Sequence, residues 1–178
     1  MKKLFILVAA LFTIGTVSAQ KFARVNLQEI VVAMPEFEQA QKNLEAFGKD
    51  LQEQMEQIQV EFNNKYADFQ KNQATMAASV KQMKQQELEQ LQQRFSEFQQ
   101  IAQQDFQKKE AELIEPVQKK ADEAVKKVAK AAGYIAVFNT AVPSLAYFDE
   151  AQLTDIAPLV KRELGIVDKP ATPATPAK

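Results

Sequence analysis

Residues 44–69 read LEAFGKDLQEQMEQIQVEFNNKYADF, and their apolar side chains recur at helical spacing. The apolar residues of the stripe are Leu44, Phe47, Leu51, Met55, Ile58, Phe62, Tyr66 and Phe69. Their spacings, 3-4-4-3-4-4-3, fit an 11-residue repeat. Such a repeat has about 3.67 residues per turn and keeps an apolar stripe nearly straight or slightly right-handed. The sequence therefore predicts one long amphipathic helix that begins near Glu36.

A second apolar stripe follows a polar stretch at residues 72–79, where the first pattern weakens. Its members are Leu88, Leu91, Phe95, Phe98, Ala102, Phe106, Leu113 and Val117, and the pattern continues to Val128. Two long helices with complementary stripes and a short polar break predict an antiparallel helical hairpin. Its first helix would span roughly 40 residues and ~60 Å.

Two residues of the second helix are candidates for hinges. Pro116 lies inside the helix, where proline removes a backbone hydrogen bond and favours a kink or a break. Gly133 is a suitable residue to end the helix. We therefore predict that the hairpin can bend at Pro116 and at Gly133.

Short strands are predicted on both sides of the hairpin. Residues 22–26 read FARVN and residues 134–139 read YIAVFN, and a third short strand is expected at residues 145–148. Asn26 and Glu29 have capping-box spacing for a short helix before Pro35, and residues 153–164 fit a final short helix that Gly165 ends. Because a hairpin returns its ends to one place, the strands can share one sheet. Such a small sheet favours burial against copies of itself.

The predicted fold class is mostly α-helical with a small β body, in which a long antiparallel helical hairpin adjoins a short-stranded oligomerisation domain. The apolar strand residues assigned to this body and its oligomer seam are Val25, Ile135, Val137, Leu145 and Tyr147. The predicted parts are a signal peptide at 1–19, the first part of the β body at 20–35, the hairpin arm at 36–132, the second part of the body at 133–166, and a disordered Pro/Ala/Thr tail at 167–178.

The first residues have the pattern of a secretory signal. A basic start, Met1-Lys2-Lys3, precedes an apolar run, and Val17-Ser18-Ala19 provides a small-x-small cleavage site. No later stretch approaches the ~18–20 apolar residues that a transmembrane helix requires. We therefore expect an exported, soluble mature chain that begins near Gln20.

Composition excludes several classes of function. The chain has no Cys and no His, so thiol nucleophiles, disulfides, imidazole bases and the commonest zinc ligands are missing. Without the two signal lysines, 20 basic side chains face 23 acidic ones, a net charge of −3. This balance excludes the broad positive field of a general nucleic-acid binder. No phosphate-binding loop is present, and we predict no enzymatic activity, metal or cofactor.

Several passages carry a resemblance to a known family. They read VNLQEI at residues 25–30, PVQKK at 116–120, GYIAVF at 133–138 and LTDI at 153–156, with long polar arms between them. On these passages the chain resembles the Skp/OmpH family of periplasmic chaperones over nearly all of its mature length. The resemblance implies a jellyfish-like homotrimer in the periplasm, with a β-barrel-like body. It also implies that three arms enclose a cavity where unfolded outer-membrane proteins are held, without nucleotide, before membrane insertion.

Client contact is assigned to apolar residues outside or beside the two stripes, because the stripes themselves are expected to pack within the hairpin. The candidates are Val60, Met76, Val80, Met83, Ile101 and Ile114. Methionine suits loose binding because its flexible side chain adapts to many surfaces. The competing interpretation is that the methionines near the loop merely close the hairpin.

Basic residues near the hairpin loop form a second candidate surface. They are Lys71, Lys81, Lys84 and Arg94, and with Glu87 and Glu89 they give a local net charge of +2. This charge could attract an anionic membrane surface or acidic client segments, although a solvated helix face is the simpler interpretation. The runner-up function for the whole chain is a structural or tethering coiled-coil protein of the cell envelope.

Overall fold

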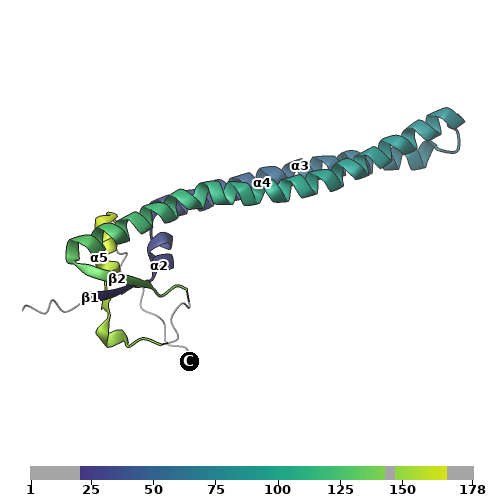
Figure 1. The fold of residues 1–178 in the computed structure, drawn as a ribbon. Helices are drawn as coiled ribbons and strands as arrows, with labels where there is room; N and C mark the ends of the chain where they lie inside the picture. The colour runs from purple at the N-terminus through teal and green to yellow at the C-terminus, as the bar shows by residue number, and fades with distance from the viewer. Residues whose placement is uncertain (1–20, 143–146, 168–178) are drawn as a thin grey trace, which may run out of the picture. The chain divides into compact units, whose positions relative to one another are not determined.

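The structure is a computed structural model that describes residues 21–142 and 147–167. The elements in chain order are β1 (Lys21–Val25), α2 (Leu27–Val32), α3 (Pro35–Asn72), α4 (Ala78–Ala132), β2 (Tyr134–Asn139), the 3-10 helix η1 (Glu150–Gln152), β3 (Thr154–Asp155) and α5 (Ala157–Glu163) (Figure 1). The predicted fold class, mostly α-helical with a small sheet, is confirmed. The predicted signal peptide, residues 168–178 of the tail, and Leu145 lie outside the described residues.

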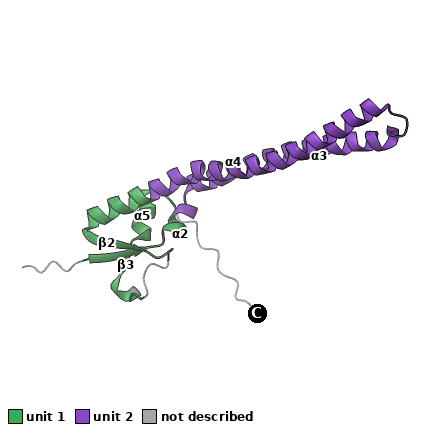
Figure 2. Cartoon of the chain, turned by 45° about the vertical axis from the view of Figure 1, so that its right-hand side comes forward, with its two compact units in different colours: residues 1–30, 122–178 green, residues 31–121 purple. Residues whose placement is uncertain are grey.

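The chain divides into two compact units, one of residues 31–121 and one of residues 1–30 with 122–178 (Figure 2). The first unit is the helical hairpin. Within it α3 and α4 lie side by side, and residues 73–77 connect them (Figure 1). Pro35 occupies the start of α3 after an extended Met34 (φ −76°, ψ 133°), as expected for a residue before proline. The predicted hairpin and its polar break are confirmed.

Seven of the eight predicted stripe residues of α3 are buried or half-buried, but from Leu51 onward the seam follows heptad spacing rather than the predicted 11-residue repeat. The buried and half-buried positions of α3 between residues 44 and 69 are Leu44, Phe47, Gly48, Leu51, Met55, Ile58, Phe62, Lys65 and Phe69, and from Leu51 onward their spacings are 4-3-4-3-4. Tyr66, which the apolar pattern placed in the stripe, is 47% exposed, and Lys65 takes the position instead. The prediction failed because it counted only apolar side chains, whereas the seam accepts a glycine and a lysine.

Gly48 makes room in the seam for an aromatic side chain of the facing helix. A Cβ atom at position 48 would lie 3.1 Å from Cε2 of Phe106, tighter than an ordinary carbon contact of about 3.5–4.0 Å. Glycine weakens a helix interior by up to about 1 kcal/mol relative to alanine. The close approach of the Phe106 ring offsets this cost.

The end of the hairpin distant from its loop is joined by an ion pair. Lys120 of α4 donates a hydrogen bond to the Glu36 carboxylate at the start of α3. This hydrogen bond is the main reason that the pKa of Glu36 lies below its ordinary value. Residues 84 positions apart in the chain are thereby held together.

Proline does not interrupt α4, which runs as a single helix through Pro116. The helix ends before Gly133, as predicted, and Gly133 has the left-handed φ of 73° that favours glycine. The hinge roles of Pro116 and Gly133 remain predictions.

The second unit contains a three-stranded sheet in the order β2-β1-β3, with both pairings parallel. In β1, Ala23 and Val25 are buried on one face. Figure 1 shows α5 and the end of α4 on one side of this sheet. The buried apolar residues of the unit are Ala23, Val25, Ile30, Ala124, Val128, Ile156 and Val160.

The third strand differs from its prediction. The described residues of the expected 145–148 strand, Tyr147 and Phe148, are not in a strand; Thr154–Asp155 pairs with β1 instead. The amide of Ile156 then donates to the carbonyl of Arg24 at 3.1 Å. Because Thr154–Asp155 pairs with β1, the final helix begins at Ala157 rather than near residue 153.

Asn139 ties the end of β2 to the start of α2. Its side-chain oxygen accepts hydrogen bonds from the amides of Leu27 at 3.2 Å and Ala141 at 3.1 Å. Asn26 caps the same helix by accepting from the Glu29 amide at 3.3 Å, which confirms the capping pattern. Two side chains from distant parts of the chain thus satisfy the first amides of α2, which have no partners within the helix.

Replacement of Asn139 by leucine removes the acceptor for two amides. We expect Asn139→Leu to lower the free energy of unfolding by about 1–3 kcal/mol, the cost of leaving such groups without partners. Asn139→Asp keeps the side-chain oxygen and should lose less than about 1 kcal/mol. Urea unfolding followed by circular dichroism measures both variants, and equal losses in the two would contradict the capping role.

A larger side chain at position 48 should disturb the seam. Gly48→Val is expected to lower the free energy of unfolding by about 1–3 kcal/mol through overpacking against Phe106, although valine is the better helix former. Ala46→Val on the exposed face is the control. Its free energy of unfolding should fall only by the difference in helix propensity between alanine and valine, about 0.6 kcal/mol. Urea unfolding compares them; a gain in stability for Gly48→Val would show that the Phe106 ring yields freely.

Candidate functional site

Candidate metal-ligating side chains do not gather in the part of the chain that the structure describes. In residues 21–142 and 147–167, no group of three or more His, Cys, Asp or Glu side chains could hold an ion. Every helix in the same residues is too short or too polar to cross a membrane. The exposed apolar side chains of the hairpin form the first candidate site.

Four of the six predicted contact residues have exposed side chains. Val60, Val80, Met83 and Ile101 are 49%, 39%, 50% and 53% exposed, respectively. Met76 and Ile114 are half-buried. The exposed four are therefore accessible for contact with another molecule, while the other two contribute partly to packing within the chain.

The exposed residues of α4 lie along one face. Met83 and Ile101 are 18 residues apart, which is about five helical turns and ~27 Å along the axis. Arg94 lies between them, about three turns from Met83, and therefore on nearly the same face. Val80 is close to this face at the loop. Isolated apolar side chains at wide spacing, with charge between them, suit contact with an extended chain.

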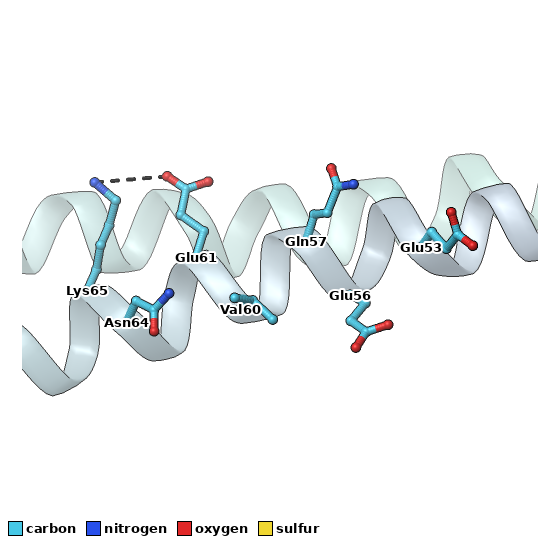
Figure 3. A pocket seen from close by; sticks show the side chains of 7 residues that line it. All are labelled: Glu53, Glu56, Gln57, Val60, Glu61, Asn64 and Lys65. Atoms are coloured by element: carbon cyan, nitrogen blue, oxygen red, sulfur yellow. Dashed lines mark ion pairs between the residues drawn. The ribbon is translucent and has the colours of Figure 1, made fainter.

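Val60 lies on α3, on the face opposite the seam. It is part of a shallow, open hollow lined by Glu53, Glu56, Gln57, Val60, Glu61, Asn64 and Lys65 (Figure 3). These residues recur at helical spacing on one side of a single helix. Glu61 and Lys65 form an ion pair of 3.9 Å at one end. A hollow this open, with one apolar side chain among polar ones, lacks the enclosure of a small-molecule site.

The predicted basic surface near the loop is partly neutralised by ion pairs. Lys84 lies 3.3 Å from Glu87, and Arg94 lies 3.7 Å from Glu61. Within the described residues, Lys71 and Lys81 have no carboxylate within 4.0 Å. The sequence indicated the local charge, but it could not indicate the pairs that join α3 to α4.

One carboxylate near the loop has a perturbed pKa. The hydrogen bond from Lys84 is the main reason that the pKa of Glu87 lies below its ordinary value, and the charges of Lys65 and Lys84 lower it further. Glu87 is therefore negatively charged at neutral pH.

The sheet carries a second candidate surface, formed by aromatic side chains. Phe22 and Phe138 stack with ring centroids 6.1 Å apart, and Phe22 is 37% exposed. Phe138 is not among the residues predicted for a surface of the sheet. The signal for it in the sequence is that neighbouring strand residues such as Val137 and Phe138 point to opposite faces. The unit therefore presents a partly exposed aromatic pair on the face of β1 opposite Ala23 and Val25.

The residues predicted to form the body and its oligomer seam differ in their exposure to solvent. Val25 is buried and Val137 is half-buried within the unit, whereas Ile135 and Tyr147 are 59% and 84% exposed. Leu145 lies outside the described residues. Because β2 is an edge strand of the sheet, Ile135 lies where another chain could approach.

Comparison with known proteins gives a consistent result. A family model described as "Outer membrane protein (OmpH-like)" matches residues 21–164. A protein of Photorhabdus laumondii named "Chaperone protein Skp" is 26% identical over 132 residues, which cover 74% of this chain and 80% of that protein. A Yersinia enterocolitica protein of the same name is 27% identical over 143 residues, which cover 80% and 86% of the two chains.

A solved OmpH-like structure from Caulobacter crescentus CB15 has a similar fold, with a TM-score of 0.71 at 12% identity, covering 82% of this chain and 83% of that one. At this identity the likeness concerns the fold alone. The family match spans most of the sequence, from the first strand through the final helix. The chain therefore belongs to the OmpH-like outer membrane protein family.

Proposed function

We propose that this protein is an ATP-independent holdase chaperone of the periplasm that binds unfolded outer-membrane proteins and prevents their aggregation before membrane insertion. Its OmpH-like family and its relatives named as chaperones support the proposal. The observation that carries it is the exposure of Val60, Val80, Met83 and Ile101 on otherwise polar helices. These side chains offer apolar contact without an enclosed pocket.

The exposed residues suit weak and non-directional binding. Full burial of one such side chain stabilises a complex by about 1.5–3 kcal/mol, and partial burial by less. One contact therefore holds a client poorly, whereas several contacts along an unfolded segment add up. No contact imposes a fixed conformation, so the client stays unfolded and separate from other clients.

The proposed active form is a homotrimer in which three hairpins enclose the cavity for the client. The small parallel sheet supports this assembly, because parallel sheets are normally covered on both faces. Phe22 and Phe138 leave aromatic surface on one face, and β2 leaves an unpaired edge with an exposed Ile135. Val25 and Val137 would support the body from within, and Tyr147 would contact a neighbouring copy.

Motion of the hairpins would adjust the cavity to clients of different size. Pro116 lacks the amide of an ordinary helical residue, and Gly133 ends α4 in a left-handed conformation. We propose that these two residues are the hinges. The lysines without nearby carboxylates, Lys71 and Lys81, would make transient contact with an anionic membrane surface.

The holdase activity is tested by diluting a urea-unfolded outer-membrane barrel into buffer and following light scattering. The wild-type chain should suppress scattering at stoichiometric excess. Met83→Gln/Ile101→Gln removes two exposed apolar side chains and should require roughly tenfold more protein for equal suppression, since the two partly buried contacts together contribute about 1.4 kcal/mol.

The control for this assay is Gln85→Ala/Gln103→Ala, which has the same spacing on another exposed face of α4 and should act as wild type. Unchanged scattering with the wild-type chain in excess would refute the holdase proposal. Capture of one specific folded partner in cross-linking, with no barrel trapped, would favour an envelope tether instead.

The trimer is tested by light scattering after gel filtration at micromolar concentration. The wild-type mass should be three times that of the mature chain, and Phe22→Lys/Phe138→Lys should yield monomers by placing charge in an apolar contact. Tyr66→Lys removes a partly exposed aromatic side chain from the hairpin and should remain trimeric. A monomeric wild-type mass would contradict the assembly.

A further inference from the structure

The seam of the hairpin changes character toward the loop. Lys65 of α3 occupies a seam position seven residues after Ile58 and four before Phe69. On α4, the half-buried Lys84 lies four residues before Leu88, and Leu91 follows three residues after Leu88. Lys84 therefore occupies a seam position of α4. Each helix therefore places a lysine where the rest of the seam has mainly apolar residues.

A single carboxylate serves both of these lysines. Glu87 Oε2 lies 3.5 Å from Nζ of Lys65 and 3.3 Å from Nζ of Lys84. The Glu61 carboxylate forms two more ion pairs, at 3.9 Å from Lys65 and 3.7 Å from Arg94. These five residues, Glu61, Lys65, Lys84, Glu87 and Arg94, are called the charged layer. Two of its ion pairs, Lys65–Glu87 and Arg94–Glu61, join one helix to the other.

The partial exposure of the charged layer makes its attraction sensitive to salt. The side chains of Lys65, Lys84 and Glu87 are 37%, 30% and 33% exposed, so water and ions still reach them. At 1 M salt the screening length is about 3 Å, similar to the ion-pair distances. The apolar contacts on either side, at Phe69 and Leu91, are both 7% exposed and do not weaken with salt in this way.

Glu87 is the residue on which the layer depends. Without its charge, the half-buried ammonium groups of Lys65 and Lys84 would lose their shared partner. An ion pair that loses one member destabilises a structure more than replacement of the whole group by apolar side chains. The Lys65–Glu87 pair, the shorter of the two that join the helices, therefore contributes only while Glu87 is charged and unscreened.

We propose that the charged layer is an ionic latch that keeps the loop end of the hairpin closed at low ionic strength and releases it when salt or substitution disrupts Glu87. Release separates the ends of α3 and α4 next to the loop and uncovers Phe69 and Leu91. If the proposed holdase function is correct, this would add apolar surface for clients. The latch itself does not depend on that function.

The test measures the distance between the helices near the loop. The chain has no cysteine, so Ala67→Cys/Gln86→Cys, at exposed positions of α3 and α4, accepts two spin labels and no others. Mixing with excess unlabelled protein restricts the measured distances to one chain. We expect a narrow distance distribution at 50 mM salt and a broader, longer one at 1 M salt. Amide exchange next to the loop should accelerate about two- to fivefold at 1 M salt, the range expected from exposed ion pairs.

Three further variants in the labelled background distinguish the latch from general fraying. Glu87→Gln should give the broad distribution even at 50 mM salt. Glu89→Gln, which neutralises a nearby exposed carboxylate, should retain the salt response of the parent. Lys65→Met/Lys84→Met/Glu87→Leu replaces the three central charges with apolar side chains and should stay narrow at both salt concentrations.

The latch is refuted if the Glu87→Gln distances match those of its parent at 50 mM salt. It is equally refuted if the triple variant broadens with salt as the parent does, because the salt response would then arise elsewhere. These distances are measured without a client. A failed latch therefore leaves the holdase proposal standing, and a failed scattering assay leaves the latch standing.

Discussion

Packing along the seam between α3 and α4 is the interaction on which the rest of the hairpin depends. Both helices are rich in Gln, Glu and Lys, and long helices in proteins owe most of their stability to packing of an apolar face. The seam provides that face through a narrow line of side chains at heptad spacing. Because the line is narrow, most of each helix surface stays exposed and polar. The isolated apolar residues on that surface are therefore distinguishable from those that pack.

Much of the fold could be predicted from local sequence pattern. The two long helices, their break at residues 73–77, the strand at Tyr134–Asn139 and the end of α4 at Gly133 all follow from periodicity and from residues that start or stop helices. What could not be predicted depends on contacts distant in sequence. Thr154–Asp155 is a strand because β1 lies beside it, and Asn139 supports α2 across 112 residues.

The candidate sites likewise have features that follow from the sequence pattern and features that depend on contacts between the helices. Exposure of Val60, Met83 and Ile101 follows from their position outside the apolar stripes. The pairing of Glu87 with Lys65 depends on the register between α3 and α4, which the sequence of neither helix specifies alone. The same register places Phe106 against Gly48, and it explains why a lysine at position 65 belongs to the seam.

The sheet has a consequence for the order in which the chain folds. Within the described residues β1 pairs with β2 and β3, and Val25 and Thr140, which close the first pairing, are 115 positions apart. Contacts of such separation form slowly unless intervening structure has already brought the segments together. Contacts in the hairpin are more local around its loop, and packing along the seam brings its two far ends together, where Glu36 and Lys120 pair. Strand pairing therefore comes late and needs the second half of the sequence, so an incompletely synthesised or truncated chain can form helices but cannot complete the sheet.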